Sequence, residues 1–257
     1  MNRLTPILKA TRAEVARRAG ATPADQLPPR ADAPRPFRDA LAKPGISVIA
    51  EHKRRSPSAG PIREDVALEQ VVAAYERGGA AALSVLTEGP SFGGSLDDLR
   101  AARAASSLPV LRKDFIVDRY QVRESAAADA DAILLIVAAL TPDELGALHA
   151  EAAQNGLAAL VEVHDANELD VALAAGADVI GINNRDLTTL HVDIERTFQL
   201  IPRVPTGKVV VAESGFSSRG ELDRLSAAGV DAVLIGEALM RAPDLEAAVR
   251  ALTARSI

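Results

Sequence analysis

The chain contains no cysteine and no tryptophan, and aromatic residues make up only 3% of its 257 residues. The absence of cysteine excludes disulfides, thiolate nucleophiles and cysteine-ligated zinc, and it is compatible with a cytoplasmic protein. With so few aromatic residues, the core has to consist mostly of Ala, Val, Leu and Ile. The composition, 48% hydrophobic and 25% charged, is nevertheless typical of a globular protein.

An excess of positive charge and a long apolar segment are also missing. The formal net charge of −6 argues against nucleic acid as the main partner, because a phosphate backbone requires a basic surface. The longest strongly apolar run, Ala132–Leu140, is too short for a bilayer, which takes about 20 residues. Residues 1–19 carry basic side chains but lack the apolar block of a signal peptide. We therefore expect no nucleic-acid partner and no membrane partner.

Two regions differ in pattern. Residues 1–45 are expected to form a helical extension and a linker, and residues 46–257 the domain that follows. The proline-rich segment Thr22–Pro36 is compatible with disorder and equally with an ordered wrap around the domain.

From residue 46 onwards, short apolar runs alternate with stretches of helix-like apolar spacing. The runs are Ser47–Ala50, Ala81–Leu86, Pro109–Leu111, Ala132–Ile136, Leu157–Val163, Val179–Ile182, Val209–Val211 and Ala232–Ile235. The clearest helical stretches are Val66–Arg77, Leu96–Ala105, Pro142–Gln154 and Leu245–Thr253. This alternation predicts an all-parallel sheet with helical crossovers.

An internal repeat of roughly fifty residues runs through the chain. It places Ala81, Asp131, Asp178 and Asp231 at matching positions, each directly before or at the start of a predicted strand. Four near-equal quarters favour a closed (β/α)₈ TIM barrel, because the edge strands of an open sheet would break the pattern. A doubly wound open sheet is the alternative fold.

Charged side chains collect where the apolar runs end, which in a barrel is the active face. Side chains of a strand alternate between its two faces, so these groups can surround one mouth. They are Glu51, Lys53, Lys113, Glu162, Asn183 and Glu213. Such a cluster suits general acid–base chemistry on a charged substrate, and a structural ion-pair network on the barrel rim is the alternative. The glycines of Glu213–Phe216 and Ile235–Leu239 favour phosphate binding after the last two strands.

Five segments carry a family resemblance: Glu51–Ser58, Leu111–Phe115, Leu160–His164, Ile182–Leu187 and Val211–Gly215. They resemble, in the same order, the signature segments of indole-3-glycerol phosphate synthase. The resemblance implies closure of the ring of 1-(2-carboxyphenylamino)-1-deoxyribulose 5-phosphate, with loss of carbon dioxide and water, in tryptophan biosynthesis. It implies a phosphorylated small-molecule substrate, no cofactor and no metal. Association with other tryptophan-pathway enzymes stays open.

The resemblance also implies roles for individual residues. Lys113 matches the general acid, Glu162 the proton-transfer partner of the dehydration, and Lys53 the residue that engages the substrate carboxylate. The orienting residues are Glu51, Asn183 and Glu213. The implied substrate-binding residues are Ser56, Ser214, Gly215, Gly236 and Glu237 at the phosphate, Phe92, Phe115, Leu134 and Leu187 around the anthranilate ring, Arg185 on the sixth loop, and Pro57, which shapes the first.

Some positions depart from this picture. Asp129 stands where the repeat has glycine, and a carboxylate at Glu237 would repel phosphate unless it points away, so its backbone amide is the expected ligand. His52 and His164 are expected to point outward as helix-packing residues. Phosphoribosylanthranilate isomerase and a non-catalytic metabolite-binding barrel remain alternative functions, although the pairing of Lys113 with Glu162 argues against the latter.

Overall fold

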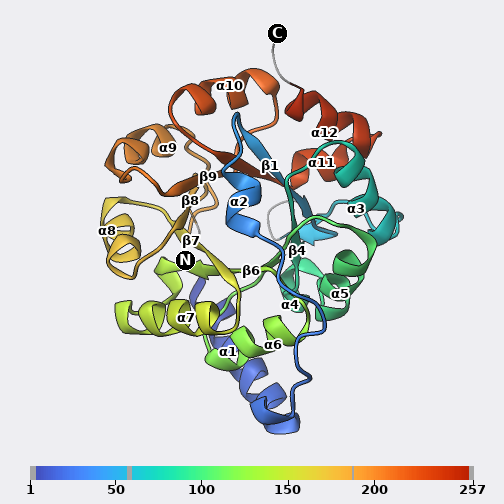
Figure 1. Cartoon of the computed structure of the whole chain (residues 1–257), viewed down its shortest axis with the longest axis vertical. Helices are drawn as coiled ribbons and strands as arrows, with labels where there is room; N and C mark the ends of the chain where they lie inside the picture. Colours follow the sequence, from blue (N-terminus) through green and yellow to red (C-terminus); the bar gives the residue numbers. More distant parts are fainter. Residues whose placement is uncertain (1–3, 57–59, 187, 255–257) are drawn as a thin grey trace.

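In a computed structural model that describes residues 4–56, 60–186 and 188–254, eight parallel strands close into a barrel surrounded by helices (Figure 1). Neighbouring strands follow the order β1-β10-β9-β8-β7-β6-β5-β4, and β4 pairs with β1 to complete the ring. The barrel strands are β1 (Ser47–His52), β4 (Ala82–Leu86), β5 (Val110–Lys113), β6 (Ala132–Ile136), β7 (Ala158–Val163), β8 (Val179–Asn183), β9 (Val209–Glu213) and β10 (Ala232–Ile235). The predicted TIM barrel is confirmed.

The remaining elements surround the ring or connect its strands. The helices are α1 (Leu4–Ala21), α2 (Phe37–Leu41), α3 (Leu68–Arg77), α4 (Gly89–Phe92), α5 (Leu96–Ala105), α6 (Arg119–Ala127), α7 (Pro142–Gln154), α8 (Ala166–Ala174), α9 (Glu195–Leu200), α10 (Arg219–Ala227), α11 (Glu237–Arg241) and α12 (Leu245–Thr253). Short 3₁₀ turns cover Ala24–Gln26, Val137–Ala139 and Ile201–Arg203, and β2 (Arg55–Ser56) pairs with β3 (Gly60–Pro61) after β1.

All eight predicted strands are present, and the main differences lie at their ends. β1, β5 and β9 continue two residues beyond the predicted apolar runs, to His52, Lys113 and Glu213. Hydropathy marks where a strand leaves the apolar core, whereas the backbone ladder continues into the polar mouth of the barrel. Helix α3 begins at Leu68 rather than Val66.

The core has two layers. Between the strands and the outer helices lies the larger apolar cluster. Inside the ring, Ile49, Leu111, Leu160 and Val211 pack together, and Phe37 of α2 joins them from the end where the strands begin. Two residues further along β1, β5, β7 and β9, the inward positions change from these apolar residues to charged ones. The barrel therefore has an apolar interior below a polar layer.

The departure at Asp129 has a structural reason. Gly79, Gly176 and Gly229 occupy the repeated turns with φ values of +93°, +84° and +95°, and Asp129 adopts φ +58° at the fourth such turn. Asp tolerates this left-handed conformation better than most residues. Its Oδ1 accepts hydrogen bonds from the backbone amides of Ala31 and Asp32, so this side chain fixes the linker.

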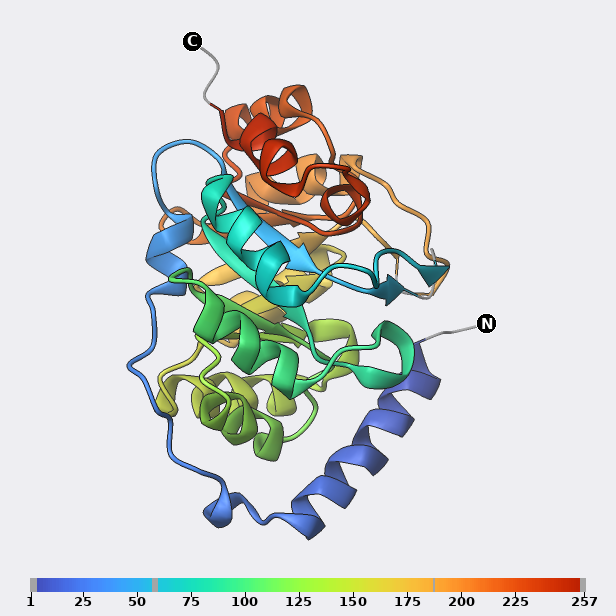
Figure 2. The same cartoon turned by 90° about the vertical axis from the view of Figure 1, so that its right-hand side faces the viewer.

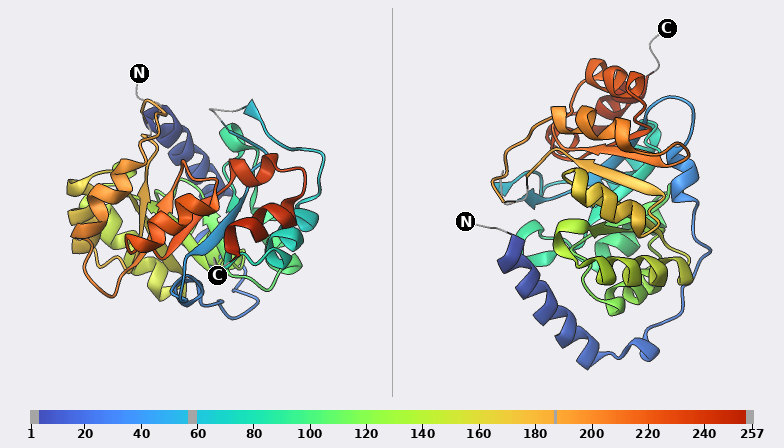
Figure 3. Two further views of the ribbon diagram at one scale, coloured as in Figure 1. Left: turned by 90° about the horizontal axis from the view of Figure 1, so that it is seen from above. Right: turned by 90° about the vertical axis from the view of Figure 1, so that its left-hand side faces the viewer.

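The segment between α1 and α2 is ordered and wraps around the barrel, running along one side from the lower end of α1 to α2 (Figures 2 and 3). Arg30 donates to the carbonyl of Ala130 at 2.6 Å and pairs with Asp131 at 3.1 Å. Arg35 donates to the carbonyl of Leu108 at 2.6 Å. Side-chain bonds to the barrel therefore hold a proline-rich stretch that has little apolar surface of its own.

None of the helices within the described ranges is long and apolar enough to cross a membrane.

Candidate active site

A cavity of about 510 Å³ opens at the carboxyl ends of the strands. Its lining includes every described residue that the sequence analysis assigned to the site: Glu51, Lys53, Ser56, Phe92, Lys113, Phe115, Leu134, Glu162, Asn183, Arg185, Glu213, Ser214, Gly215, Gly236 and Glu237. Pro57 and Leu187 lie outside the described residues. Side chains from all eight strands or the loops after them thus meet in one space, as the end-of-strand pattern predicted.

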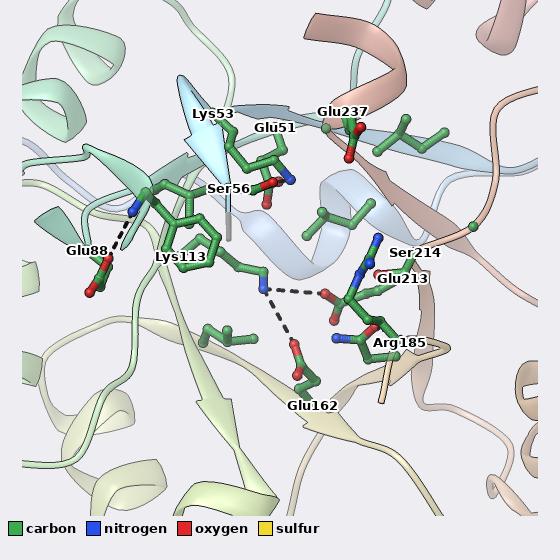
Figure 4. A pocket seen from close by; sticks show the side chains of 18 of the residues that line it. Glu51, Lys53, Ser56, Glu88, Lys113, Glu162, Arg185, Glu213, Ser214 and Glu237 are labelled. Atoms are coloured by element: carbon green, nitrogen blue, oxygen red, sulfur yellow. Dashed lines mark hydrogen bonds and ion pairs between the residues drawn. The ribbon is translucent and has the colours of Figure 1, made fainter. Parts of the chain in front are cut away.

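At the floor of the cavity, the ammonium of Lys113 lies between two buried carboxylates (Figure 4). Its Nζ is 3.5 Å from Oε2 of Glu162 and 3.7 Å from Oε2 of Glu213. A second ion pair joins Lys53 Nζ to Glu51 Oε1 at 2.8 Å. The carboxylates are at most 4% exposed, so water screens these charges weakly.

Burial and charge act in opposite directions on these groups. Burial alone would lower the pKa of Lys113, but Glu162, Glu213 and Glu51 together raise it well above its ordinary value. Burial would raise the pKa of Glu162, but Lys113 holds it below its usual range. For Glu213, burial and the negative charge of Glu162 raise the pKa. At neutral pH the site therefore holds a proton donor at Lys113, an ionised base at Glu162 and a readily protonated carboxyl at Glu213.

The raised pKa of Glu213 predicts how a variant responds to pH. A carboxyl whose pKa is higher in the folded state stabilises the fold below its unfolded pKa, near 4.5, and loses this contribution as pH rises through the folded pKa. The free energy of unfolding of Glu213→Gln minus that of the parent protein should therefore be larger at pH 9 than at pH 5. Urea unfolding at both pH values measures this difference. The exposed Glu195→Gln control should show no such trend, and an equal trend in both variants would contradict the assignment.

Two glycines leave the space that the carboxylates of Glu213 and Glu51 occupy. A Cβ at Gly181, on β8, would overlap Oε1 of Glu213, and a Cβ at Gly236, directly after β10, would overlap Oε1 of Glu51. Gly236 was expected at a phosphate loop, and the structure shows an additional reason for glycine there. Any side chain would displace Glu51 from its ion pair with Lys53.

Gly236→Ala should therefore reduce activity without disturbing the fold. Displacing a polar group by about 1 Å in a site of this kind costs roughly 10- to 100-fold in turnover. The matched control is Gly146→Ala, because a Cβ there meets nothing within 4 Å and alanine favours helix α7. Steady-state turnover and thermal unfolding of both variants test this prediction. Full activity in Gly236→Ala would show that turnover does not depend on the position of the Glu51 carboxylate.

After β9 and β10 the chain forms a second polar region, adjacent to the charged cluster. Ser214 and Gly215 both have positive φ, +66° and +95°, and a Cβ at Gly215 would lie 2.7 Å from Val192. Glu237 accepts a hydrogen bond from Arg241 Nε at 3.0 Å, so its carboxylate is neutralised by a cation that also lines the cavity. A carboxylate at position 237 is thus compatible with an anion nearby.

Apolar side chains form another part of the cavity wall. Phe92 on α4, Phe115 after β5 and Leu134 on β6 contribute to it, as predicted from the sequence. Leu4 and Ile7 of α1 also line the cavity, which the sequence analysis did not identify individually. A flat aromatic ring could therefore contact carbon on several sides.

His164 contacts helix α8, as expected for a helix-packing residue, but its ring also lies next to Glu162. His164 Nε2 lies 3.4 Å from Oε1 of Glu162, and its Nδ1 lies 3.0 Å from Oε2 of Glu168. Strand β7 ends at Val163, so strand alternation does not determine the direction of the next side chain. The sequence did hold a signal, since residues 162 and 164 would share a face if the strand continued.

Comparison with known proteins agrees with this architecture. The family profile described as indole-3-glycerol phosphate synthase matches residues 4–252. The chain is 55% identical over 218 residues to indole-3-glycerol phosphate synthase 2 of Streptomyces coelicolor, covering 85% of this chain and 84% of that protein. It is 49% identical over 258 residues to indole-3-glycerol phosphate synthase of Rhizorhabdus wittichii, covering 98% of each.

A solved structure of thiamine phosphate pyrophosphorylase from Pyrococcus furiosus superposes with a TM-score of 0.62 at 19% identity, covering 84% of this chain and 96% of that one. This likeness reflects the barrel fold alone. The family profile spans every segment that lines the cavity, from Leu4 to Arg241, and the Rhizorhabdus relative matches 98% of the chain. The chain belongs to the indole-3-glycerol phosphate synthase family, carboxy-lyases of tryptophan biosynthesis.

Proposed function

We propose that Lys113 and Glu162 are the acid and the base with which this chain converts 1-(2-carboxyphenylamino)-1-deoxyribulose 5-phosphate to indole-3-glycerol phosphate. The observation that carries the proposal is the Lys113 ammonium, which lies between two buried carboxylates inside a cavity with apolar walls. A ring closure that begins on a carbonyl needs a proton donor next to an aromatic-binding surface. This cavity offers both.

In the first step, the ring carbon that bears the carboxylate attacks the ketone carbon, and Lys113 gives a proton to the carbonyl oxygen. The attack leaves positive charge on the ring and its nitrogen. The carbon–carboxylate bond then breaks, its electron pair returns to the ring, and carbon dioxide leaves. Because the ring itself accepts the electrons, the step balances without an added cofactor.

The second step removes water. The new hydroxyl leaves with a proton, and the methylene group beside the nitrogen loses one, which gives the indole double bond. Glu162 is suited to accept that proton because Lys113 holds it ionised. Lys53 is a second ammonium in the cavity, able to engage the substrate carboxylate and to take part in proton transfer. Glu51, Asn183 and Glu213 orient these groups.

Binding divides between the two ends of the substrate. We propose that Ser56, Ser214 and Gly215, with the backbone at Gly236 and Glu237, receive the phosphate, and that Arg185 contacts the ribulose chain. Phe92, Phe115 and Leu134 would hold the anthranilate ring. By motif, Leu187 would join this ring pocket and Pro57 would shape the first loop. Helix α1 would close the mouth over the ring through Leu4 and Ile7. We place the enzyme in the cytoplasm.

A turnover assay tests the proposal. Purified protein is incubated with the carboxyphenylamino deoxyribulose phosphate, and indole fluorescence is followed. The isomerase alternative is tested in parallel with phosphoribosylanthranilate as the only substrate. Indole formation from the first substrate and no isomerisation of the second are expected. Binding of the first substrate without turnover would instead support a metabolite-binding barrel.

A further inference from the structure

A second carboxylate lies behind the proposed base, with a histidine between the two. His164 contacts Glu162 through Nε2, at 3.4 Å from Oε1, and Glu168 through Nδ1, at 3.0 Å from Oε2. The three side chains become more exposed along the series, from 1% for Glu162 through 12% for His164 to 20% for Glu168. Glu162, His164 and Glu168 therefore form a row of side chains that leads from the cavity floor towards the outside of the barrel.

The two oxygens of Glu162 have different neighbours. Oε2 faces Lys113 in the cavity, and Oε1 faces His164. Oε1 and His164 Nε2 are both buried, and within the described part of the chain neither has a partner at hydrogen-bonding geometry. At 3.4 Å the contact is an ion pair rather than a short hydrogen bond. The orientation of the Glu162 carboxylate thus depends on one cation on each side.

The histidine itself is held firmly. Glu168 Oε2 accepts a hydrogen bond from the backbone amide of His164 at 2.7 Å in addition to its contact with the ring. Glu168 lies in the first turn of α8, where its own amide donates to Asp165 Oδ1 at 2.9 Å. A capped helix start therefore fixes the imidazole, and the imidazole in turn contacts Glu162.

We propose that His164, held by Glu168, is a positioning residue that keeps Glu162 ionised and directed at the cavity for the dehydration. This inference rests on the proposed function, because it assigns a supporting pair to the base of that reaction. His164 does not line the cavity and acts through Glu162. The substrate class is unchanged.

The charges around the row agree with this role. Burial would lower the pKa of His164, but Glu162 and Glu168 raise it to about 10, so the ring is an imidazolium at neutral pH. Glu162 faces Lys113 from β5, Asn183 from β8 and Glu213 from β9 as well as this ring. If the imidazolium were removed, Lys113 and the Asn183 amide would have to compensate the burial of Glu162, and the pKa of Glu162 would then rise.

His164→Gln keeps a side-chain amide donor and removes the charge. In a single turnover, we expect carbon dioxide release within about threefold of the parent rate and indole formation slowed by about tenfold. This is less than the roughly 10²-fold or more that loss of a general base costs, because Glu162 itself remains. The acid limb of the kcat profile should move up by about one pH unit. Equal slowing of both steps, or an unchanged pH profile, would overturn the proposal.

Glu168→Gln is a second test of the proposal, and it leaves the imidazole ring of His164 in place. The imidazole titration, followed by NMR among the four histidines of the chain, should move down by about one pH unit or more in this variant. Indole formation should slow in the same sense as in His164→Gln. An unchanged imidazole titration would overturn the proposal even if His164→Gln failed to fold.

Two controls separate this inference from the proposed function. Glu144 caps α7 by accepting from the Thr141 amide at 2.8 Å, as Glu168 accepts from the His164 amide at α8, but its ion pair is with Arg12 rather than with a histidine next to Glu162. Glu144→Gln should keep the parental pH profile and indole rate. His149→Gln replaces a histidine of α7 and should do the same. If the parent protein is active and His164→Gln forms indole at the parental rate, the positioning role alone is wrong. If the parent protein is inactive, the proposed function is wrong.

Discussion

Replacing Lys113 with alanine is expected to reduce turnover by about 10³-fold, within the range measured for loss of a positioned proton donor. Without this ammonium the ketone oxygen loses its proposed proton donor as the ring attacks, and Glu162 and Glu213 lose the cation that lies between them. Affinity for a phosphate-bearing product analogue should change only a few-fold, because the residues after β9 and β10 are untouched. Steady-state kinetics and calorimetric titration of the analogue measure the two effects.

Lys208→Ala is the matched control for this prediction. Lys208 pairs with Asp178 at 2.8 Å beside the start of β9, at the opposite end of that strand from the cavity. Its removal should leave turnover unchanged. Comparable activity in Lys113→Ala and Lys208→Ala would show that Lys113 is not the acid, and loss of analogue binding in Lys113→Ala would indicate a binding role instead.

Arg112→Met is expected to lower the free energy of unfolding by about 3–5 kcal/mol, the cost of leaving a buried partner charge uncompensated. Arg112 is 1% exposed and lies next to Lys113, facing away from the barrel interior. It pairs with Asp114 at 2.9 Å and Glu124 at 3.0 Å, and it donates to Ser125 Oγ at 3.0 Å. Methionine fills similar space but removes the buried cation, so that Asp114 keeps the Thr87 hydroxyl and Glu124 keeps Arg18 as partners, and both lose the guanidinium that neutralises them.

Urea unfolding measures the loss, and Arg77→Ala provides the comparison. Arg77 pairs with Glu246 at 2.7 Å, but its side chain is 60% exposed. An exposed pair of this kind contributes about 1 kcal/mol or less. A similar, small change in both variants would mean that the Arg112 network adds nothing to stability. The network also reaches α1 through Arg18, which pairs with Glu124 at 2.8 Å.

The barrel could be predicted from the sequence because each of its parts leaves a local signature. Each β run is a short apolar segment, three of the four repeated turns carry a glycine, and the four quarters recur at a regular spacing. The site could be predicted for the same reason: in parallel strands that share one polarity, residues such as Lys113 and Glu162 at the ends must lie at one mouth. Composition and alternation alone indicated these features.

Features that depend on contacts distant in sequence could not be predicted in this way. Strand parity places His164 on the same face as Glu162, but its second contact, with Glu168 at the start of α8, depends on how the chain turns after β7 ends at Val163. The order of the linker depends on Asp129 and Asp131, which accept its backbone and side-chain donors from about 100 positions away. The room that Gly236 leaves for Glu51 is likewise visible only once β1 and β10 are neighbours.

The most direct test of this account is the release of labelled carbon dioxide from substrate that carries the label in the ring carboxylate. With the purified protein, one carbon dioxide should be released for each indole-3-glycerol phosphate formed, and both should fall together by about 10³-fold in Lys113→Ala. Folded protein that binds the substrate yet releases no label, or Lys113→Ala that releases it at the parental rate, would contradict the central claim that Lys113 starts the ring closure.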